Sequence, residues 1–207
     1  MSAVESGVID TCSSNKSTRL LSKEKFVFAA GRLWDEAKNA SAVDNIAANL
    51  SWTVCIAGDA VEPDGTFPGQ TSFSGARFLG KLDDEEMRRT FAQAAIFASP
   101  AKYEPFGLCA LEAGLSGCAL VLGDIPSFRE LWDGAALFAD PEDPAGLEEA
   151  LELLIKNKWM RNELAWRARE RALRYSTARM TESYLDMYSS MVRVLPSTAL
   201  TEVTSCA

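Results

Sequence analysis

Two glutamates eight positions apart carry the clearest chemical signal in this sequence. Glu104 lies in a polar turn, and Glu112 lies in the apolar, helix-like segment 106–115 that follows it. A helix beginning near Phe106 would place the second carboxylate on the order of 9 Å along its axis. Gly107 would let a phosphate approach the free backbone N–H groups at the helix start. This spacing suits two hydroxyl-bearing groups joined by a diphosphate, which is the layout of a nucleotide-sugar. Alternatively, each glutamate is a solvated acid that stabilises the helix start.

Arg32 and Lys38 form a second group that suits an anion. Both lie in the polar segment 31–39, directly after an apolar run that predicts a buried strand. Arginine offers a planar fork of donors and lysine a point charge, so the pair suits a diphosphate approached from the side opposite a helix N-terminus. Taken alone, both are equally consistent with surface charges in a loop.

The first of these segments resembles a motif of the retaining glycosyltransferases of the glycogen-synthase-like group, whose GT-B fold has two Rossmann-type halves. The run EPFG at 104–107, with Glu112, resembles the E-x7-E motif of that family. The resemblance implies that Glu104 binds hydroxyls of the donor sugar and that Glu112 binds the ribose of the nucleotide. It also implies that Phe106, Gly107 and Leu108 meet the sugar and diphosphate through their backbone.

The segment 31–39 resembles the diphosphate-binding loop of the same family, in a variant with a W-D-E insert. The resemblance implies that Gly31, Arg32 and Lys38 bind the donor. It places Arg32, Lys38 and Glu104 at the reaction, where the cations stabilise the departing diphosphate. Ala37 departs from the pattern, since a glycine is usual beside that lysine. A left-handed turn at this position would strain Ala37 and displace Lys38.

Two further segments match the family. The resemblance implies that Gly58, Leu79 and Gly80 contact the nucleotide base, mainly through the main chain, so their identities do not select a base. The segment 124–130 also matches the family closely, and for it we predict only the role of a turn and helix cap.

Composition limits the partners and the compartment. The formal charge of -8 argues against nucleic acid or an anionic membrane surface as the main partner. Five cysteines, without a C-x-x-C pair, predict reduced thiols in a cytoplasmic protein. We find no signal-peptide pattern and no apolar run that predicts a transmembrane segment. The absence of histidine removes the commonest general base and metal ligand, and neither a metal nor a cofactor is implied; the nucleotide-sugar would be a substrate.

The elements that must position these residues alternate between short apolar runs and helical patterns. This alternation predicts an α/β domain with a Rossmann-like parallel sheet, helices on both faces and a helical C-terminal extension. The predicted strands are 26–30, 52–57, 76–79, 96–99, 118–122 and 135–139, and helices are predicted up to about 50, over 83–95 and 106–116, and through 131. The loops after Ala30, Ala57, Leu79 and Ser99 would then lie at the carboxyl edge of the sheet. By resemblance, the chain is one half of a GT-B fold, the donor-binding half.

We predict four segments along the chain. These are a disordered lead-in over 1–25, a nucleotide-sugar-binding domain over 26–175, a C-terminal helix over 176–195 and a disordered tail over 196–207. Five arginines in 159–175 are interpreted as a solvated helix face. The last helix carries an apolar stripe that either packs in the core or forms a docking face: Met180, Tyr184, Met187, Tyr188, Met191 and Leu195. In the family this helix crosses onto the other half, so an acceptor-domain partner or self-association is expected.

The leading hypothesis is a donor-binding domain of a retaining glycosyltransferase. It would transfer a sugar to an acceptor hydroxyl only when an N-terminal acceptor half is supplied. One alternative is a non-catalytic nucleotide-sugar-binding or interaction module of the same origin. Another is half of a nucleotide-sugar epimerase, or a phosphorylase on the same fold, which would need a lysine holding pyridoxal phosphate. The sequence does not select among UDP, GDP and ADP.

Overall fold

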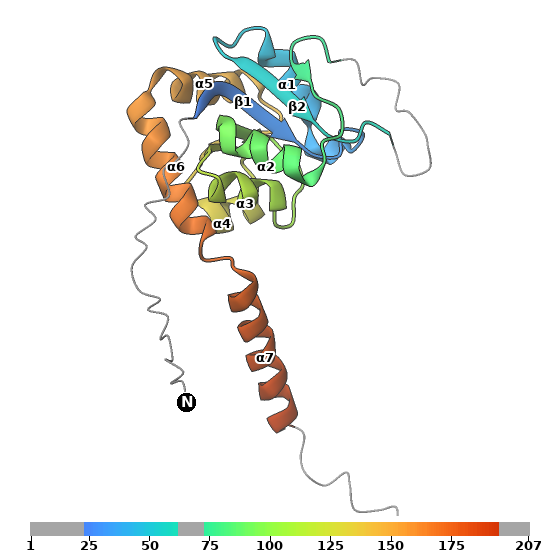
Figure 1. The fold of residues 1–207 in the computed structure, drawn as a ribbon, viewed down its shortest axis with the longest axis vertical. Helices are drawn as coiled ribbons and strands as arrows, with labels where there is room; N and C mark the ends of the chain where they lie inside the picture. Colours follow the sequence, from blue (N-terminus) through green and yellow to red (C-terminus); the bar gives the residue numbers. More distant parts are fainter. Residues whose placement is uncertain (1–22, 62–72, 195–207) are drawn as a thin grey trace, which may run out of the picture.

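The computed structural model describes residues 23–61 and 73–194, and its centre is a parallel sheet of six strands (Figure 1). The strand order is β3-β2-β1-β4-β5-β6, and each neighbouring pair is parallel. This order confirms the predicted Rossmann-like sheet. The strands are β1 (Glu24–Ala30), β2 (Thr53–Ala57), β3 (Arg77–Phe78), β4 (Ala94–Ser99), β5 (Ala119–Gly123) and β6 (Leu137–Ala139).

Helices cover both faces of the sheet. One apolar layer packs α1 and α5 against one face, and a second layer packs α2, α3, α4 and the end of α6 against the other. The helices are α1 (Ala40–Ala47), α2 (Asp84–Gln93), α3 (Leu108–Leu115), α4 (Pro126–Trp132), α5 (Pro144–Lys156), α6 (Lys158–Ala172) and α7 (Thr177–Val194). A 3-10 turn, η1 (Glu36–Lys38), precedes α1.

The two layers follow from the pleat of the central strands. Successive side chains of β1 point to opposite faces, so Val27 joins the layer under α1 and α5 while Phe28 joins the other. Phe28 packs against Phe91 of α2 and Phe97 of β4, with ring centroids 5.3 and 6.1 Å away. The sequences of these buried strands are continuous apolar runs because helices cover both faces of the sheet.

Several predicted boundaries differ from the structure. β1 begins at Glu24, so the lead-in predicted to reach residue 25 extends too far. Residues 1–22 of that lead-in, residues 62–72 and the tail 196–207 lie outside the described residues. The helix predicted from Phe106 begins at Leu108, because Gly107 holds a left-handed conformation, with φ of 84°, immediately before it.

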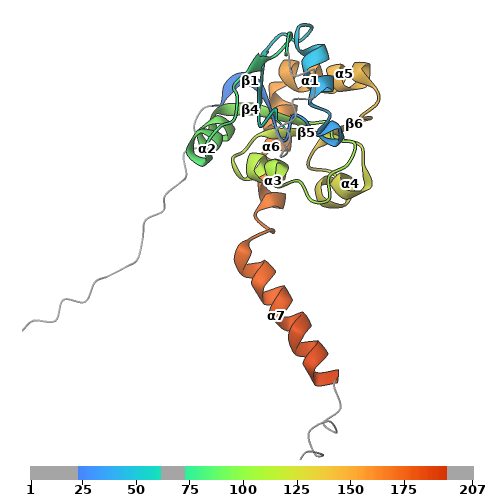
Figure 2. The same ribbon diagram turned by 90° about the vertical axis from the view of Figure 1, so that its right-hand side faces the viewer.

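Helix α7 leaves the sheet domain and extends away from it (Figure 2). Every side chain from Thr177 to Val192 is exposed. Of the two interpretations of its apolar stripe, packing in the core of this domain is therefore wrong. Leu195, the last residue of the predicted stripe, lies outside the described residues.

Across residues 23–61 and 73–194, no helix combines the length and the apolar content that crossing a bilayer requires.

Candidate functional site: a crevice at the reversal of strand order

The candidate site lies where the strand order reverses, between β1 and β4. The chain moves outward from β1 through β2 to β3, and then returns to β4 on the other side of β1. In open α/β sheets such a reversal leaves a crevice beyond the carboxyl ends of the two central strands. A narrow cavity of about 60 Å³ occupies this place. Its walls include Gly31, Lys38, Ser99, Glu104, Gly107, Cys109 and Phe128.

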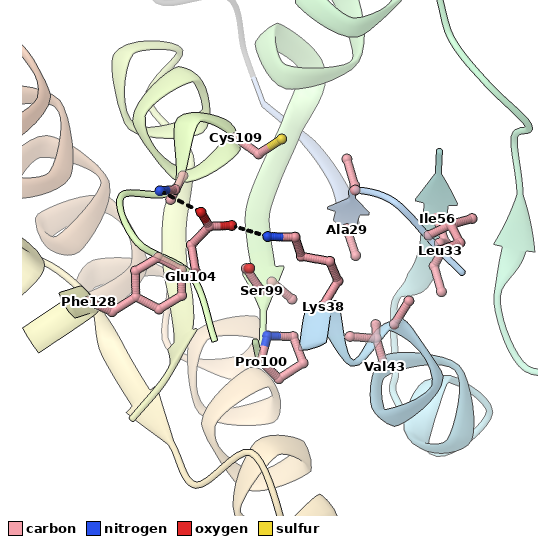
Figure 3. A pocket seen from close by; sticks show the side chains of 16 residues that line it. Ala29, Leu33, Lys38, Val43, Ile56, Ser99, Pro100, Glu104, Cys109 and Phe128 are labelled. Carbon is pink, nitrogen blue, oxygen red and sulfur yellow. Dashed lines mark hydrogen bonds and ion pairs between the residues drawn. The ribbon is translucent and has the colours of Figure 1, made fainter. Parts of the chain in front are cut away.

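Lys38 and Glu104 meet across this crevice (Figure 3). The Lys38 Nζ atom lies 2.6 Å from Oε2 of Glu104, and the two side chains are 18% and 20% exposed. The other carboxylate oxygen, Oε1, accepts a hydrogen bond of 3.1 Å from the backbone N–H of Gly107. Glu104 thus touches both the ammonium and the helix-start N–H that we predicted to face a diphosphate.

Arg32 is placed differently from Lys38. Its guanidinium donates to Oδ2 of Asp35 at 2.6 Å and lies 5.3 Å from the ring centroid of Trp34. The side chain is 58% exposed and is not part of the crevice wall. A ligand in the crevice would have to draw Arg32 away from Asp35, so its role as a diphosphate ligand stays a prediction.

The loop around Lys38 has its left-handed residue at position 39, not 37. Asn39 is the non-glycine residue with positive φ, at 54°, among the described residues. Asparagine tolerates this conformation better than most residues do. Its buried side-chain amide donates to the carbonyls of Pro100 and Pro141, at 3.0 and 2.9 Å. Ala37 lies within η1. The strain that we expected there is therefore absent, and the loop presents Lys38 to the crevice.

Glu112 lies on the same helix as the crevice wall but faces a different hollow. Together with Asp84 and Met87 of α2, it lines a cavity of about 510 Å³ between α2 and α3. Burial raises the pKa of Glu112, and the charge of Asp84 raises it further. The two acids of the E-x7-E run therefore stand at neighbouring sites along α3, with Glu104 before its first turn and Glu112 in its second.

Cys109 lies between these two acids in the sequence, and the charges of both affect the pKa of its thiol. Burial raises the pKa of its thiol to about 11, and the charges of Glu112 and Glu104 act in the same direction, while Lys38 opposes them. A thiol with such a pKa stays protonated near neutral pH. Cys109 therefore acts as an apolar wall of the crevice.

Three glycines bring the loops after β1, β2 and β3 together. The Gly58 N–H donates to the Gly80 carbonyl at 2.9 Å, and the Gly31 N–H donates to the Ala57 carbonyl at 3.1 Å. A Cβ atom on Gly58 would lie 1.8 Å from the carbonyl oxygen of Gly31, so this position has no room for any other residue. Leu79 adds a backbone bond to Ile56 at 2.8 Å. The loops after these strands thus adjoin at one edge, as predicted.

Phe106 and Leu108 turn toward the start of α7. The Phe106 ring meets the Tyr175 ring edge-on, with centroids 5.6 Å apart. Leu108 is 66% exposed and lines a hollow of about 860 Å³ that Tyr175 and the first turns of α7 share. Only their backbone could serve the crevice, which is the role that the resemblance implied for both residues.

Two residues in the segment 124–130, for which we predicted only a turn and a cap, position the Glu104 turn. The Ser127 hydroxyl donates to the backbone carbonyl of Glu104, and the Phe128 ring lies against Gly107. A Cβ atom on Gly107 would come within 2.7 Å of that ring. This segment therefore holds the Glu104 turn in place and begins α4, although no side chain caps the N-terminus of that helix. Its position directly after β5, at the same sheet edge, was the available signal.

The fold and its crevice define a Rossmann-like α/β domain whose binding edge carries an acid and a cation. The chain belongs to the family of group 1 glycosyl transferases, whose model matches residues 24–157. This confirms the family predicted from the run at 104–112 and from the segment 31–39.

Curated relatives match the chain over part of their length. A D-inositol 3-phosphate glycosyltransferase of Nocardioides sp. is 32% identical over 114 residues, which cover 54% of this chain and 25% of the relative. A glycogen synthase of Mycobacterium tuberculosis is 34% identical over 97 residues, 46% of this chain and 23% of the relative. The matched region is thus about a quarter of the length of each.

Solved structures confirm the fold and its GT-B context. Anabaena HepE, in complex with UDP and glucose, superposes with a TM-score of 0.70 at 19% identity, over 81% of this chain and 49% of HepE. The C-terminal domain of the group 1 glycosyl transferase LpcC from Francisella tularensis superposes with a TM-score of 0.62 at 20% identity. That match covers 73% of this chain and 86% of the LpcC domain. The chain therefore shares the fold of these proteins.

Proposed function

We propose that this domain binds the nucleotide-sugar donor of a retaining glycosyltransferase, which transfers the sugar to an acceptor hydroxyl. The observation that carries the proposal is the meeting of Lys38, Glu104 and the Gly107 N–H in the crevice between β1 and β4. An ammonium and a helix-start N–H are the groups that neutralise a diphosphate, and a carboxylate beside them can accept hydrogen bonds from sugar hydroxyls.

In this proposal the donor replaces the contacts that Glu104 makes in the free domain. The diphosphate would accept hydrogen bonds from the Lys38 ammonium and from the backbone N–H groups at the start of α3. The Glu104 carboxylate, released from both, would accept from hydroxyls of the sugar. The nucleoside would extend along α3 toward Glu112, whose carboxylate can accept from both ribose hydroxyls, and toward the loop at Gly80. Departure of the sugar leaves negative charge on the diphosphate, which Lys38 and the helix start stabilise without a metal ion.

Calorimetric titration with UDP, GDP and ADP, each alone and as a sugar conjugate, tests the proposal. Glu104→Ala should weaken only the sugar conjugates, whereas Glu112→Ala should weaken every nucleotide, because one acid meets the sugar and the other the ribose. Glu163→Ala is the matched control, since its carboxylate pairs with Arg167 on α6 and lines neither the crevice nor the hollow at Glu112. Equal losses for both glutamate variants, or no nucleotide binding at all, would contradict the assignment.

We also propose that α7 docks on an acceptor-binding half. Its apolar side chains are largely uncovered: Met180, Tyr184, Met187, Tyr188 and Met191 are each between 44% and 59% exposed. A contiguous apolar face of this kind is typical of a surface that a partner covers. The hollow between Leu108 and the start of α7 continues this face toward the crevice. A partner seated there would close the donor site and exclude water.

Sedimentation of the isolated chain tests this docking surface. With no acceptor half present, the exposed stripe should drive self-association, and Met187→Asp should restore a monomer without changing the melting temperature. Glu182→Gln on the same helix is the control. A chain that is already monomeric, and that loses stability on the Met187 substitution, would show that the stripe packs within its own domain.

The alternative of a binding module without turnover shares the same crevice. It is favoured if the domain binds a nucleotide-sugar but neither transfers nor hydrolyses it when candidate acceptor halves are present.

A further inference from the structure

A further cavity lies at the opposite edge of the sheet from the crevice. It has a volume of about 590 Å³ and opens between the amino-terminal ends of the strands and one face of α6. Figure 1 shows α6 beside the start of β1, whereas the crevice lies beyond the other end of that strand. This volume is within the range of small-molecule sites in proteins. Nothing in the proposed donor function uses this cavity, and we refer to it as the α6 pocket.

The ionisable side chains that line the α6 pocket are all basic. Two lie at or just before the start of β1 and three lie along α6: Lys23, Lys25, Lys158, Arg161 and Arg169. No aspartate or glutamate of the described residues lines it. Five cations around one cavity are unusual in a chain whose net charge is -8.

Within residues 23–61 and 73–194, none of these five cations forms an ion pair with a carboxylate; their described partners are neutral. Lys23 donates to the Phe91 carbonyl at 2.8 Å, and Arg161 donates to the Leu154 carbonyl at 2.6 Å. Arg169 donates to the Leu115 carbonyl at 3.3 Å. These carbonyls lie in the last turns of α2, α5 and α3, where the helix dipole favours a cation, so they offset part of the positive charge.

Two of the cations are also partly removed from water. Burial lowers the pKa of Lys23 and that of Arg161, which means that their charged forms are disfavoured where they stand. A negative charge placed in the pocket would offset this cost for both residues at once. The described residues offset the positive charge of the pocket only in part, through helix carbonyls and without a carboxylate.

Two tryptophans give the pocket apolar surface beside its charge. The Arg161 guanidinium lies 4.8 Å from the ring centroid of Trp52, which fixes both groups in place. Trp166, one turn further along α6, also lines the pocket and is 60% exposed. An exposed indole beside clustered cations suits a ligand with an organic body and an anionic group, more than it suits a bare ion.

We propose that the α6 pocket binds a small organic phosphate monoester. A doubly charged phosphate matches several converging cations better than a single carboxylate does, and the indole of Trp166 would pack against the organic part. The concave shape of the pocket favours a free small molecule over a phosphate on a flat lipid surface. The proposal is independent of the donor site, since the two sites share no residue.

The test is calorimetric titration of the full chain with ribose 5-phosphate and with inorganic phosphate. The informative variant is Lys25→Glu with Lys158→Glu, because both side chains are exposed and a glutamate at the first residue of α6 suits the helix dipole. The matched control is Arg88→Glu with Arg89→Glu, which changes the net charge equally on exposed positions of α2. Circular dichroism melting checks that both variants fold.

We expect the pocket variant to bind ribose 5-phosphate at least about tenfold more weakly, and the control less than about twofold. Trp166→Ala should weaken ribose 5-phosphate but not inorganic phosphate. Equal weakening in both charge variants would indicate a general effect of net charge and overturn the proposal. Loss of binding in Lys38→Ala instead would place the ligand in the crevice. Binding only to vesicles of phosphatidylcholine with phosphatidic acid would identify a membrane-facing patch, and also overturn it.

Discussion

The Lys38 ammonium lies 2.6 Å from the Glu104 carboxylate, so the cation and the acid of two distant sequence segments close on each other across the crevice. Sixty-six residues separate them in the chain. The pair occupies the place where we propose that the donor diphosphate binds. Glu104 contacts both the Lys38 ammonium and the backbone N–H of Gly107, the two groups that would bind the diphosphate in the proposed donor complex.

Replacing Lys38 by alanine should weaken nucleoside diphosphates about tenfold or more, because a charge-assisted hydrogen bond is lost. Nucleosides, which lack the diphosphate, should bind as before. Arg32→Ala should have a smaller effect, since Arg32 is 58% exposed and already pairs with Asp35. Calorimetry with UDP and uridine measures both effects. A larger loss for Arg32→Ala than for Lys38→Ala would show that Arg32 is the main diphosphate ligand.

Replacing Glu112 by glutamine should stabilise the free domain at pH 7. Burial and the charge of Asp84 raise the pKa of Glu112 above 4.5, so the ionised Glu112 carboxylate lowers the free energy of unfolding. This cost is absent below pH 4.5, where the carboxyl is protonated in both states, and complete above the raised pKa. We expect a gain of less than about 1 kcal/mol at pH 7, because the site is partly solvated, and none at pH 4. Urea unfolding at both pH values measures it, and an equal gain at both would contradict this origin.

Cys109 should react slowly with alkylating reagents until the pH is high. Its pKa of about 11 comes from burial first and from Glu112 second, so Glu112→Gln should lower the pKa and speed alkylation at pH 8. Mass spectrometry of the peptide that contains Cys109 separates it from the other cysteines. A bound nucleotide-sugar should protect it, because it lines the crevice. Alkylation that levels off near pH 9 would mean that the thiol is not buried in solution.

Replacing Gly58 by alanine should destabilise the domain by about 2–4 kcal/mol, since the new Cβ would overlap the Gly31 carbonyl oxygen. Gly80→Ala is the matched comparison. Gly80 has a φ of 73° but no atom within 4 Å of the added Cβ, so only backbone strain of about 1–2 kcal/mol applies. Urea unfolding measures both. Similar costs would show that the loops separate easily in solution.

The sequence alone determined the strands and the order of the binding loops. The apolar runs around Phe28 and Phe97 predict buried strands because both faces of a parallel sheet are covered, and that pattern is local. The helix predicted over 83–95 likewise begins where expected, and Asp83 and Glu86 form a full capping box at its start. The family could be predicted from the paired glutamates and the Gly31–Asn39 segment, because residue types and their spacing are properties of the linear sequence.

Only the tertiary structure decided how these residues meet. Whether Lys38 or Arg32 faces the crevice depends on Asn39, whose side chain bridges to Pro100 and Pro141, and no local pattern specifies those partners. Distant segments also decide three other features. Ser127 positions the Glu104 turn by a hydrogen bond, and α2 and α3 together form the separate hollow at Glu112. Helix α7 is exposed because no described segment packs against its apolar stripe. Local sequence sets backbone preferences, but the direction of a side chain at a sheet edge is set by what the neighbouring strands bring beside it.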